Sequence, residues 1–80
     1  SKVDQYNEYV MTGFRTIWGV SANFIENNFN SKFKNYFTDR IQKHIDQKNI
    51  IVKDDIYTTT NEGRFLADGI SSDLFLVNLK

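Results

Sequence analysis

Three groups of residues in this 80-residue chain carry side chains that other proteins use for binding or catalysis. Arg15 lies between a glycine and a short apolar run. A guanidinium binds carboxylates through paired hydrogen bonds, so Arg15 is a candidate contact for an anionic group. His44 is the single histidine, and imidazole is a common iron ligand, although a lone histidine beside an apolar stripe is more often a partly buried helix residue. Asp54 and Asp55 are adjacent carboxylates without further spaced oxygen ligands, which predicts a solvated turn and not a calcium site.

The composition excludes several kinds of site. Because the chain has no cysteine, these residues cannot ligate an iron–sulfur cluster or a cysteine-bound zinc ion. Ten basic and ten acidic residues cancel, whereas a nucleic-acid-binding domain usually carries an excess of Lys and Arg. No apolar run approaches the ~20 residues of a membrane-spanning helix. Seven Phe, four Tyr and one Trp can supply the core of one small domain without disulfides.

Apolar spacing predicts three helices in the first half of the chain. Residues 3–12 form one helical face, with Gly13 as a stop, and residues 14–20 form a connector with a brief extended piece. Ser21 is predicted to cap a second helix through Asn28, with Phe24, Ile25 and Phe29 facing inward. Ser31 is predicted to cap a third helix that ends at residues 48–49. Its apolar residues recur at every fourth position: Phe33, Phe37, Ile41 and Ile45.

The second half of the chain predicts a hairpin followed by a helix. Residues 50–52 and 56–58 are β-branched runs separated by an acidic turn. Residues 59–62 match a capping box, in which Thr59 and Glu62 would satisfy each other's backbone donors. A single helix follows, with Phe65, Leu66, Ile70 and Leu74 predicted inward and Gly69 either packing closely or bending the helix. We therefore expect residues 1–80 to form one α+β, mostly α domain: a winged helix-turn-helix with a short two-stranded β-hairpin and a C-terminal helix.

Three segments of the chain resemble a known module. They are residues 6–20, which include Asn7-Glu8-Tyr9 and Trp18-Gly19; the aromatic helix 33–45; and residues 60–75, which include Ala67-Asp68-Gly69-Ile70. In order and spacing they are similar to the C-terminal domain of the oxygen-independent coproporphyrinogen III oxidase-like family, many of whose members are radical-SAM heme chaperones. The Trp18-Gly19 pair and the phrase at 67–70 look similar to members from Bacteroidetes.

The resemblance implies a cytoplasmic parent protein in porphyrin biosynthesis or heme handling. That parent would carry an N-terminal radical-SAM barrel with a [4Fe–4S] cluster on a Cys-x3-Cys-x2-Cys motif and would bind S-adenosylmethionine. None of those residues is present in this chain, so we expect it to be a non-catalytic fragment without catalytic, cofactor-binding or metal-binding residues. Its expected partners are the missing barrel and, through the parent, heme or porphyrin.

Four residues are candidate contacts with the barrel or a tetrapyrrole: Arg15, Trp18, Phe75 and Leu76. Arg15 would reach a porphyrin propionate or a barrel carboxylate, unless it forms an ion pair inside the domain. The apolar tail, which includes Val77 and Leu79, would cover either the barrel or the domain's own core. A flat porphyrin platform made of Tyr6, Tyr9, Trp18 and Tyr36 is a further hypothesis, against which plain core packing of these rings is the simpler interpretation.

Three functions remain open from the sequence. The first is an accessory domain packed beside the barrel of a heme-handling protein. The second is a substrate-enclosing domain of an authentic oxygen-independent coproporphyrinogen III oxidase. The third is a DNA-binding regulator that uses helix 31–48 for recognition; the mixed charges of that helix and the acidic hairpin turn argue against it.

Overall fold

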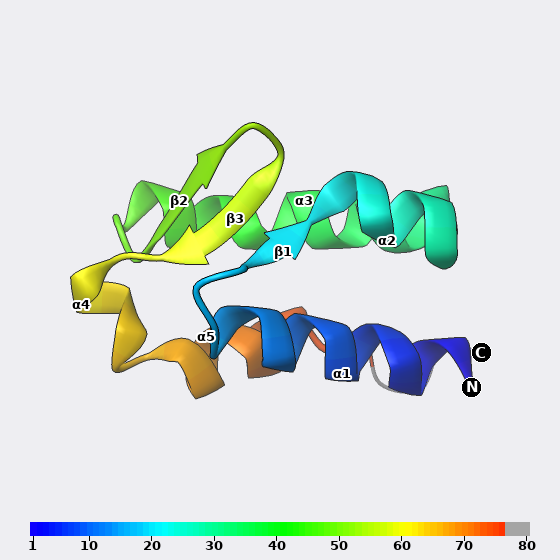
Figure 1. Ribbon diagram of the computed structural model, residues 1–80, viewed down its shortest axis with the longest axis horizontal. Helices are drawn as coiled ribbons and strands as arrows, with labels where there is room; N and C mark the ends of the chain where they lie inside the picture. Colours follow the sequence, from blue (N-terminus) through cyan, green and yellow to red (C-terminus); the bar gives the residue numbers. More distant parts are fainter. Residues whose placement is uncertain (77–80) are drawn as a thin grey trace.

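The computed structural model describes residues 1–76, which fold into five helices and three strands (Figure 1). Helix α1 (Lys2–Phe14) leads into strand β1 (Val20–Ser21), helix α2 (Ala22–Asn28) and helix α3 (Ser31–Asp46). The hairpin β2 (Ile50–Lys53) and β3 (Ile56–Thr59) follows, and then helices α4 (Asn61–Arg64) and α5 (Ala67–Leu74). Helix α1 packs against α5, and α2 packs against α3. This confirms the predicted α+β, mostly α fold with a winged-helix order of elements.

The sheet has three strands, not the two that were predicted. Its order is β1-β3-β2, and both pairings are antiparallel. Val20 and Ser21 pair with Tyr57 and Ile56, so the predicted extended piece of the connector is the third strand. Two residues are too few to reveal their distant partner through any local pattern, which is why the sequence indicated only a hairpin. The turn at Asp54 and Asp55 is confirmed, and both residues have positive φ.

The helix boundaries differ from prediction where a neighbouring polar side chain forms the cap. Ser21 caps α2 as predicted, since its side chain accepts a hydrogen bond from the Phe24 N–H. Helix α3, in contrast, is capped by Asn30 and not by Ser31: the Asn30 Oδ1 accepts from the Phe33 N–H at 2.9 Å. Helix α1 does not stop at Gly13 but continues to Phe14, with Gly13 buried inside it.

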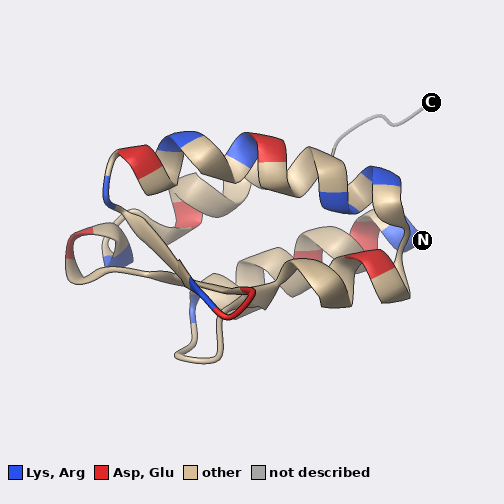
Figure 2. Ribbon diagram, turned by 90° about the horizontal axis from the view of Figure 1, so that it is seen from above, with Lys and Arg blue, Asp and Glu red and all other residues tan. Residues whose placement is uncertain are grey.

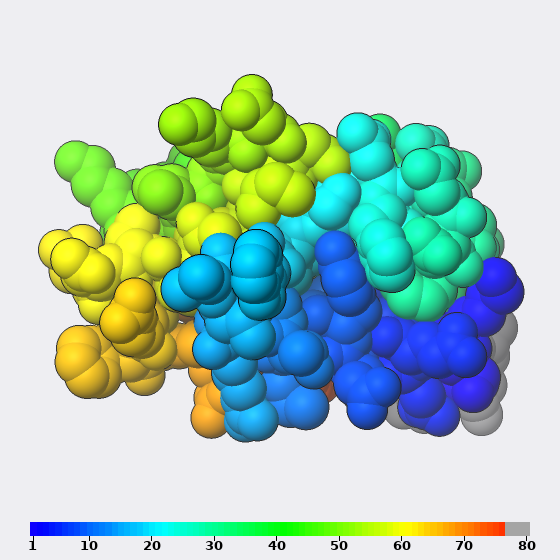
Figure 3. Space-filling view, in the orientation of Figure 1, coloured from blue at the N-terminus to red at the C-terminus, as the bar shows by residue number. Residues whose placement is uncertain are grey.

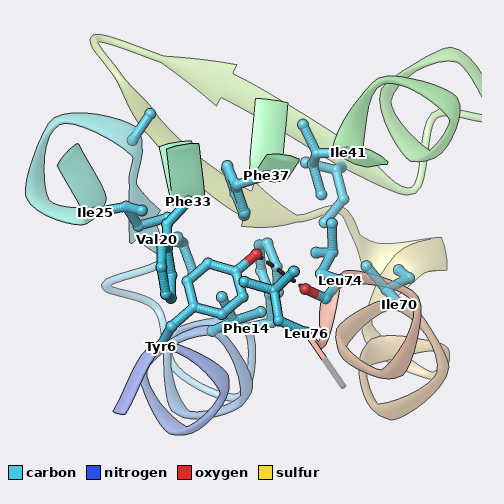
Figure 4. Packing of buried hydrophobic residues seen from close by; sticks show 13 residues of the cluster. Tyr6, Phe14, Val20, Ile25, Phe33, Phe37, Ile41, Ile70, Leu74 and Leu76 are labelled. Carbon is cyan, nitrogen blue, oxygen red and sulfur yellow. Dashed lines mark hydrogen bonds between the residues drawn. The ribbon is translucent and has the colours of Figure 1, made fainter. Parts of the chain in front are cut away.

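The core is a continuous cluster between the two helix layers (Figure 4). Phe33, Phe37 and Ile41 of α3 are buried as predicted, whereas Ile45 is only half-buried and His44 lies inside instead. Tyr6 is fully buried, and its hydroxyl donates to the Leu74 carbonyl at 2.9 Å, which ties α1 to α5. Burial raises the pKa of the Tyr6 hydroxyl well above its usual value of 10.0 because the phenolate would lose its hydration.

The C-terminal region is two helices separated by a break, where one continuous helix was predicted. Ile70 and Leu74 are buried as expected, but Phe65 and Leu66 lie in the break and are exposed. Gly69 neither packs closely nor marks the break, since a Cβ built on it would meet no atom within 4 Å. Phe24, also predicted inward, lies at the surface and is 42% exposed, where one side of its ring stacks on Tyr9 with ring centroids 4.4 Å apart.

Candidate docking groove

A groove of about 640 Å³ lies between the connector that follows α1 and the segment around α4. One wall is formed by residues 14–17, and the other by Arg64, Phe65, Ala67 and Asp68. Thr58 and Thr59 of β3 also line it. In the space-filling view the connector is raised on the face toward the viewer, with the residues of α4 beside it (Figure 3). We call this feature the connector–α4 groove.

Large apolar side chains stand exposed around the connector–α4 groove. Ile17 is 80% exposed and Trp18 is 78% exposed on the connector. Phe65 is 90% exposed and Leu66 is 52% exposed in the break after α4. Single exposed apolar residues are ordinary, but a cluster of them beside a groove is typical of an interaction surface. Of the four, the sequence singled out Trp18 alone as a contact.

The wall at α4 is held in place by direct contact with the turn between α3 and β2. A Cβ on Gly63 would collide with the Asn49 carbonyl oxygen, so only glycine allows α4 to approach this closely. The Thr60 hydroxyl donates to the Lys48 carbonyl at 2.8 Å and accepts from the Gly63 N–H at 3.0 Å. Thr60 is therefore the cap of α4, and the predicted Thr59–Glu62 capping box is wrong: Thr60 caps the Gly63 N–H, and glycine has no side chain to return the hydrogen bond. These contacts present Arg64 and Phe65 to solvent.

The wall at the connector is shaped by Gly19 and Thr16. Gly19 has a φ of +72° and lies against β3, where a Cβ would collide with the Tyr57 carbonyl oxygen. The Thr16 hydroxyl donates to the Gly13 carbonyl and accepts from the Trp18 N–H. The chain is thereby turned back onto the sheet, and Ile17 and Trp18 are left on the outside of the turn.

Two arginines line the groove, and they differ in what they bind. The Nε and Nη2 atoms of Arg15 both donate to the Asp68 Oδ1, at 3.1 and 3.0 Å, so Arg15 forms an ion pair within the domain. Arg64 has no carboxylate within ion-pair distance among residues 1–76. The sequence indicated Arg15 and missed Arg64. Only the fold shows that Asp68 lies beside Arg15 and binds its guanidinium, while Arg64 has no such carboxylate among residues 1–76.

The other two sequence candidates lie within the apolar layers of the fold. Leu76 is 4% exposed, packed in the core cluster, and Phe75 is half-buried with its carbonyl accepting from the Tyr36 hydroxyl. Asn7 fixes the same segment, since its Oδ1 accepts from the Leu76 N–H and its Nδ2 donates to the Leu76 carbonyl. Leu76 therefore packs into the domain's own core, and the Phe75 backbone is tied to α3. Val77 and Leu79 lie outside the described residues.

The aromatic platform is not assembled in the structure. Tyr6 is inside the core, Trp18 is on the exposed connector, and Tyr36 lies on α3 beneath the guanidinium of Arg40, 4.9 Å from the ring centroid. Tyr9 is half-buried and accepts a hydrogen bond from the Ser21 N–H. Core packing and surface stacking account for these rings.

His44 and the acidic turn make structural contacts within residues 1–76. The Nε2 of the buried His44 lies 3.1 Å from the Asp73 Oδ2, and Lys43 binds the same oxygen at 3.1 Å. Asp55 accepts from the Ser21 hydroxyl at 2.6 Å and from the Asn23 N–H at 3.0 Å, so it supports the start of α2. Nowhere in the described residues do three His, Asp or Glu side chains gather in a way that could hold a metal ion.

The candidate recognition helix α3 carries interspersed charges along its exposed side (Figure 2). Two of its lysines are paired with carboxylates: Lys34 lies 3.5 Å from Glu26, and Lys43 pairs with Asp73. Paired lysines release few counterions from a phosphate backbone, so this face gives little support for DNA binding. The absence of a nucleic-acid partner stays a prediction. Within residues 1–76, no helix has the length and apolar character needed to cross a bilayer.

A family model described as the HemN C-terminal domain matches residues 1–66. The match covers well over half of the chain and includes both walls of the connector–α4 groove up to Leu66. This chain belongs to the HemN C-terminal domain family. No curated protein and no solved structure matches it. The resemblance expected from the spaced motifs is thereby confirmed at the level of the family, and the groove is a feature of a HemN C-terminal domain.

Proposed function

We propose that this HemN C-terminal domain is a non-catalytic accessory domain that packs beside a radical-SAM barrel in heme biosynthesis or heme delivery, in the cytoplasm. The single observation that supports this most strongly is the family match over residues 1–66. The cluster of exposed apolar side chains around the connector–α4 groove adds a surface suited to such packing.

The chemistry of the proposed parent would lie outside this chain. A [4Fe–4S] cluster needs thiolate ligands, and this chain has no cysteine, so its residues do not fit that group. We propose that the cluster and S-adenosylmethionine are bound by the barrel. The side chains around the connector–α4 groove would contribute shape, apolar surface and the guanidinium groups of Arg15 and Arg64.

A second candidate role is enclosure of a tetrapyrrole substrate, as in an authentic oxygen-independent coproporphyrinogen III oxidase. One observation favours it: the groove combines the guanidinium group of Arg64, and that of Arg15 in its ion pair with Asp68, with exposed apolar side chains, which suits a flat apolar ligand bearing carboxylates. Arg15 and Trp18 retain enough exposed surface for this contact, whereas Leu76 does not.

The test uses the full-length parent protein with and without residues 1–80, under anaerobic conditions. Decarboxylation of coproporphyrinogen and binding of heme are measured for both forms, and the isolated chain is the control. We expect the isolated chain to turn over no tetrapyrrole and the truncated parent to lose substrate or heme binding. Decarboxylation by the intact parent supports the oxidase role, and stable heme binding without decarboxylation supports the delivery role. Turnover by the isolated chain would refute the accessory function.

A further inference from the structure

We propose that the connector–α4 groove is the docking site for an apolar segment of the barrel that carries a carboxylate, and that Arg64 is the residue that binds this carboxylate. The inference rests on the proposed function, because it takes the barrel as the partner. It goes further by naming the surface, the charge of the partner and the arginine involved.

The apolar part of the inference follows from where the exposed side chains lie. Ile17 and Phe65 line opposite walls of the groove, and they are the two most exposed large apolar residues in the part of the chain that the structure describes. Each would remove most of its apolar area from water when covered, and the hydrophobic effect favours this. Aromatic residues at the centre of an interface commonly contribute the largest share of binding energy.

The charge of the partner follows from the different states of the two arginines. Asp68 already neutralises Arg15 through two hydrogen bonds to one carboxylate oxygen. Arg64 has no such carboxylate among residues 1–76, so covering it with a purely apolar surface would bury an uncompensated charge. A partner carboxylate removes that cost and adds charge-assisted hydrogen bonds.

Two other surfaces suit this partner less well. A shallower groove between α1 and α2 contains Tyr9 and Phe24, but its charged lining residue is Glu8, which would repel a carboxylate. The edge strand β2 exposes Ile51 and Val52 beside the acidic turn, and both are less exposed than Ile17 or Phe65. Only the connector–α4 groove combines strong apolar exposure with an arginine that lacks a carboxylate partner within residues 1–76.

The first experiment measures amide hydrogen exchange in the isolated chain, whose core is closed within residues 1–76, and in the full-length protein. We expect protection in the full-length protein at residues 15–18, 58–59 and 64–68, and unchanged exchange on β2 and at the Tyr9–Phe24 surface. Protection confined to either of those other surfaces would overturn the inference and leave the proposed function intact. If no segment were protected, the packing role itself would fail.

The second experiment tests the carboxylate with variants of the full-length protein. Arg64→Glu is expected to lower the protection factors of residues 15–18 and 64–68 roughly tenfold or more, because the new carboxylate would repel the partner's carboxylate. Arg64→Gln is expected to lower them less, because glutamine only removes the attractive charge. Arg40→Glu is the matched control, since it makes the same charge change on α3. Equal effects of Arg64→Glu and Arg40→Glu would contradict a specific contact.

Two further measurements test the apolar contact and check that each variant still folds. Ile17→Ser should reduce the protection and Ile51→Ser should not, because both remove an exposed isoleucine but only one lies in the groove. Melting of each isolated variant chain checks that the fold is retained. If protection appeared only after coproporphyrinogen or heme was added, the carboxylate would belong to the ligand and the inference of a protein carboxylate would be wrong.

Discussion

Gly63 and Gly69 show how differently two nearby glycines act. We predict that Gly63→Ala destabilises the chain by about 2 kcal/mol or more, because its Cβ would collide with the Asn49 backbone and push α4 away. Gly69→Ala should instead stabilise it by ~0.5–1 kcal/mol, since its Cβ enters open space and alanine favours the helix. The measurement is the free energy of unfolding from urea titration. Equal effects of the two substitutions would contradict the close approach of α4 to Asn49.

Asp73 links α5 to α3, and its contribution depends on pH. The hydrogen bond from Lys43 is the largest cause that holds the pKa of Asp73 below its usual 3.8; desolvation opposes it, and the charges of Lys43 and His44 reinforce it. Because the folded-state pKa is lowered, the stabilisation is complete above the unfolded-state value and is lost as pH falls through the folded-state value.

We therefore predict that Asp73→Asn lowers the free energy of unfolding at pH 7 and has a smaller effect once the pH falls below the lowered folded-state pKa of Asp73, where the wild-type carboxylate is itself protonated. Urea titrations of both proteins at pH 7 and near pH 2.5 measure this difference. Asp54→Asn, in the exposed turn, is the control. A difference that stays constant across this range would show that the ionised Asp73 does not contribute.

At the scale of elements, the sequence was informative wherever a local pattern determines the structure. The recurrence of Phe33, Phe37 and Ile41 identified α3, and the acidic turn identified the hairpin. Strand β1 could not be found in full, because its two residues become a strand only by pairing with residues 56–57. The break between α4 and α5 was missed because Phe65 and Leu66 continue an apolar helical pattern that solvent exposure contradicts.

The same limit applies to the site. Arg15 and Trp18 were identified from their local context, but the role of Arg64 depends on Asp68 lying beside Arg15, a contact across 53 residues. Phe65 was assigned to the core by its spacing alone. Tertiary contacts, which single-sequence patterns do not contain, place Arg15, Arg64 and Phe65 on one groove, with Trp18 next to its lining residue Ile17.

Thr60 tests the element-scale account of α4. We predict that Thr60→Ala destabilises the chain by about 1–2 kcal/mol, because it removes both the cap of α4 and the hydrogen bond to the Lys48 carbonyl. Glu62→Ala should change the stability by less than about 0.5 kcal/mol, since Glu62 is exposed and its side chain makes no hydrogen bond among residues 1–76. Both effects are measured by urea titration. A larger effect of Glu62→Ala would contradict this account and support the capping box predicted between Thr59 and Glu62.

At the scale of the whole molecule, the core and the exposed apolar residues are separated. The buried cluster is closed by α1, α3, α5 and the sheet, and Leu76 packs into it after α5. The connector and the α4–α5 break contribute little to that core but carry the most exposed apolar side chains. In the proposed arrangement, the buried cluster keeps this HemN C-terminal domain folded and the exposed apolar residues contact the barrel.

The most direct test of this account is the association of the purified barrel, produced without residues 1–80, with this chain added separately. Analytical ultracentrifugation with a labelled chain measures binding, and heme or coproporphyrinogen binding by the mixture measures function. The account predicts saturable one-to-one binding that restores the tetrapyrrole binding lost on truncation. A chain that remains unbound at high micromolar barrel, or a truncated barrel that binds tetrapyrrole as well as the intact protein, would contradict it.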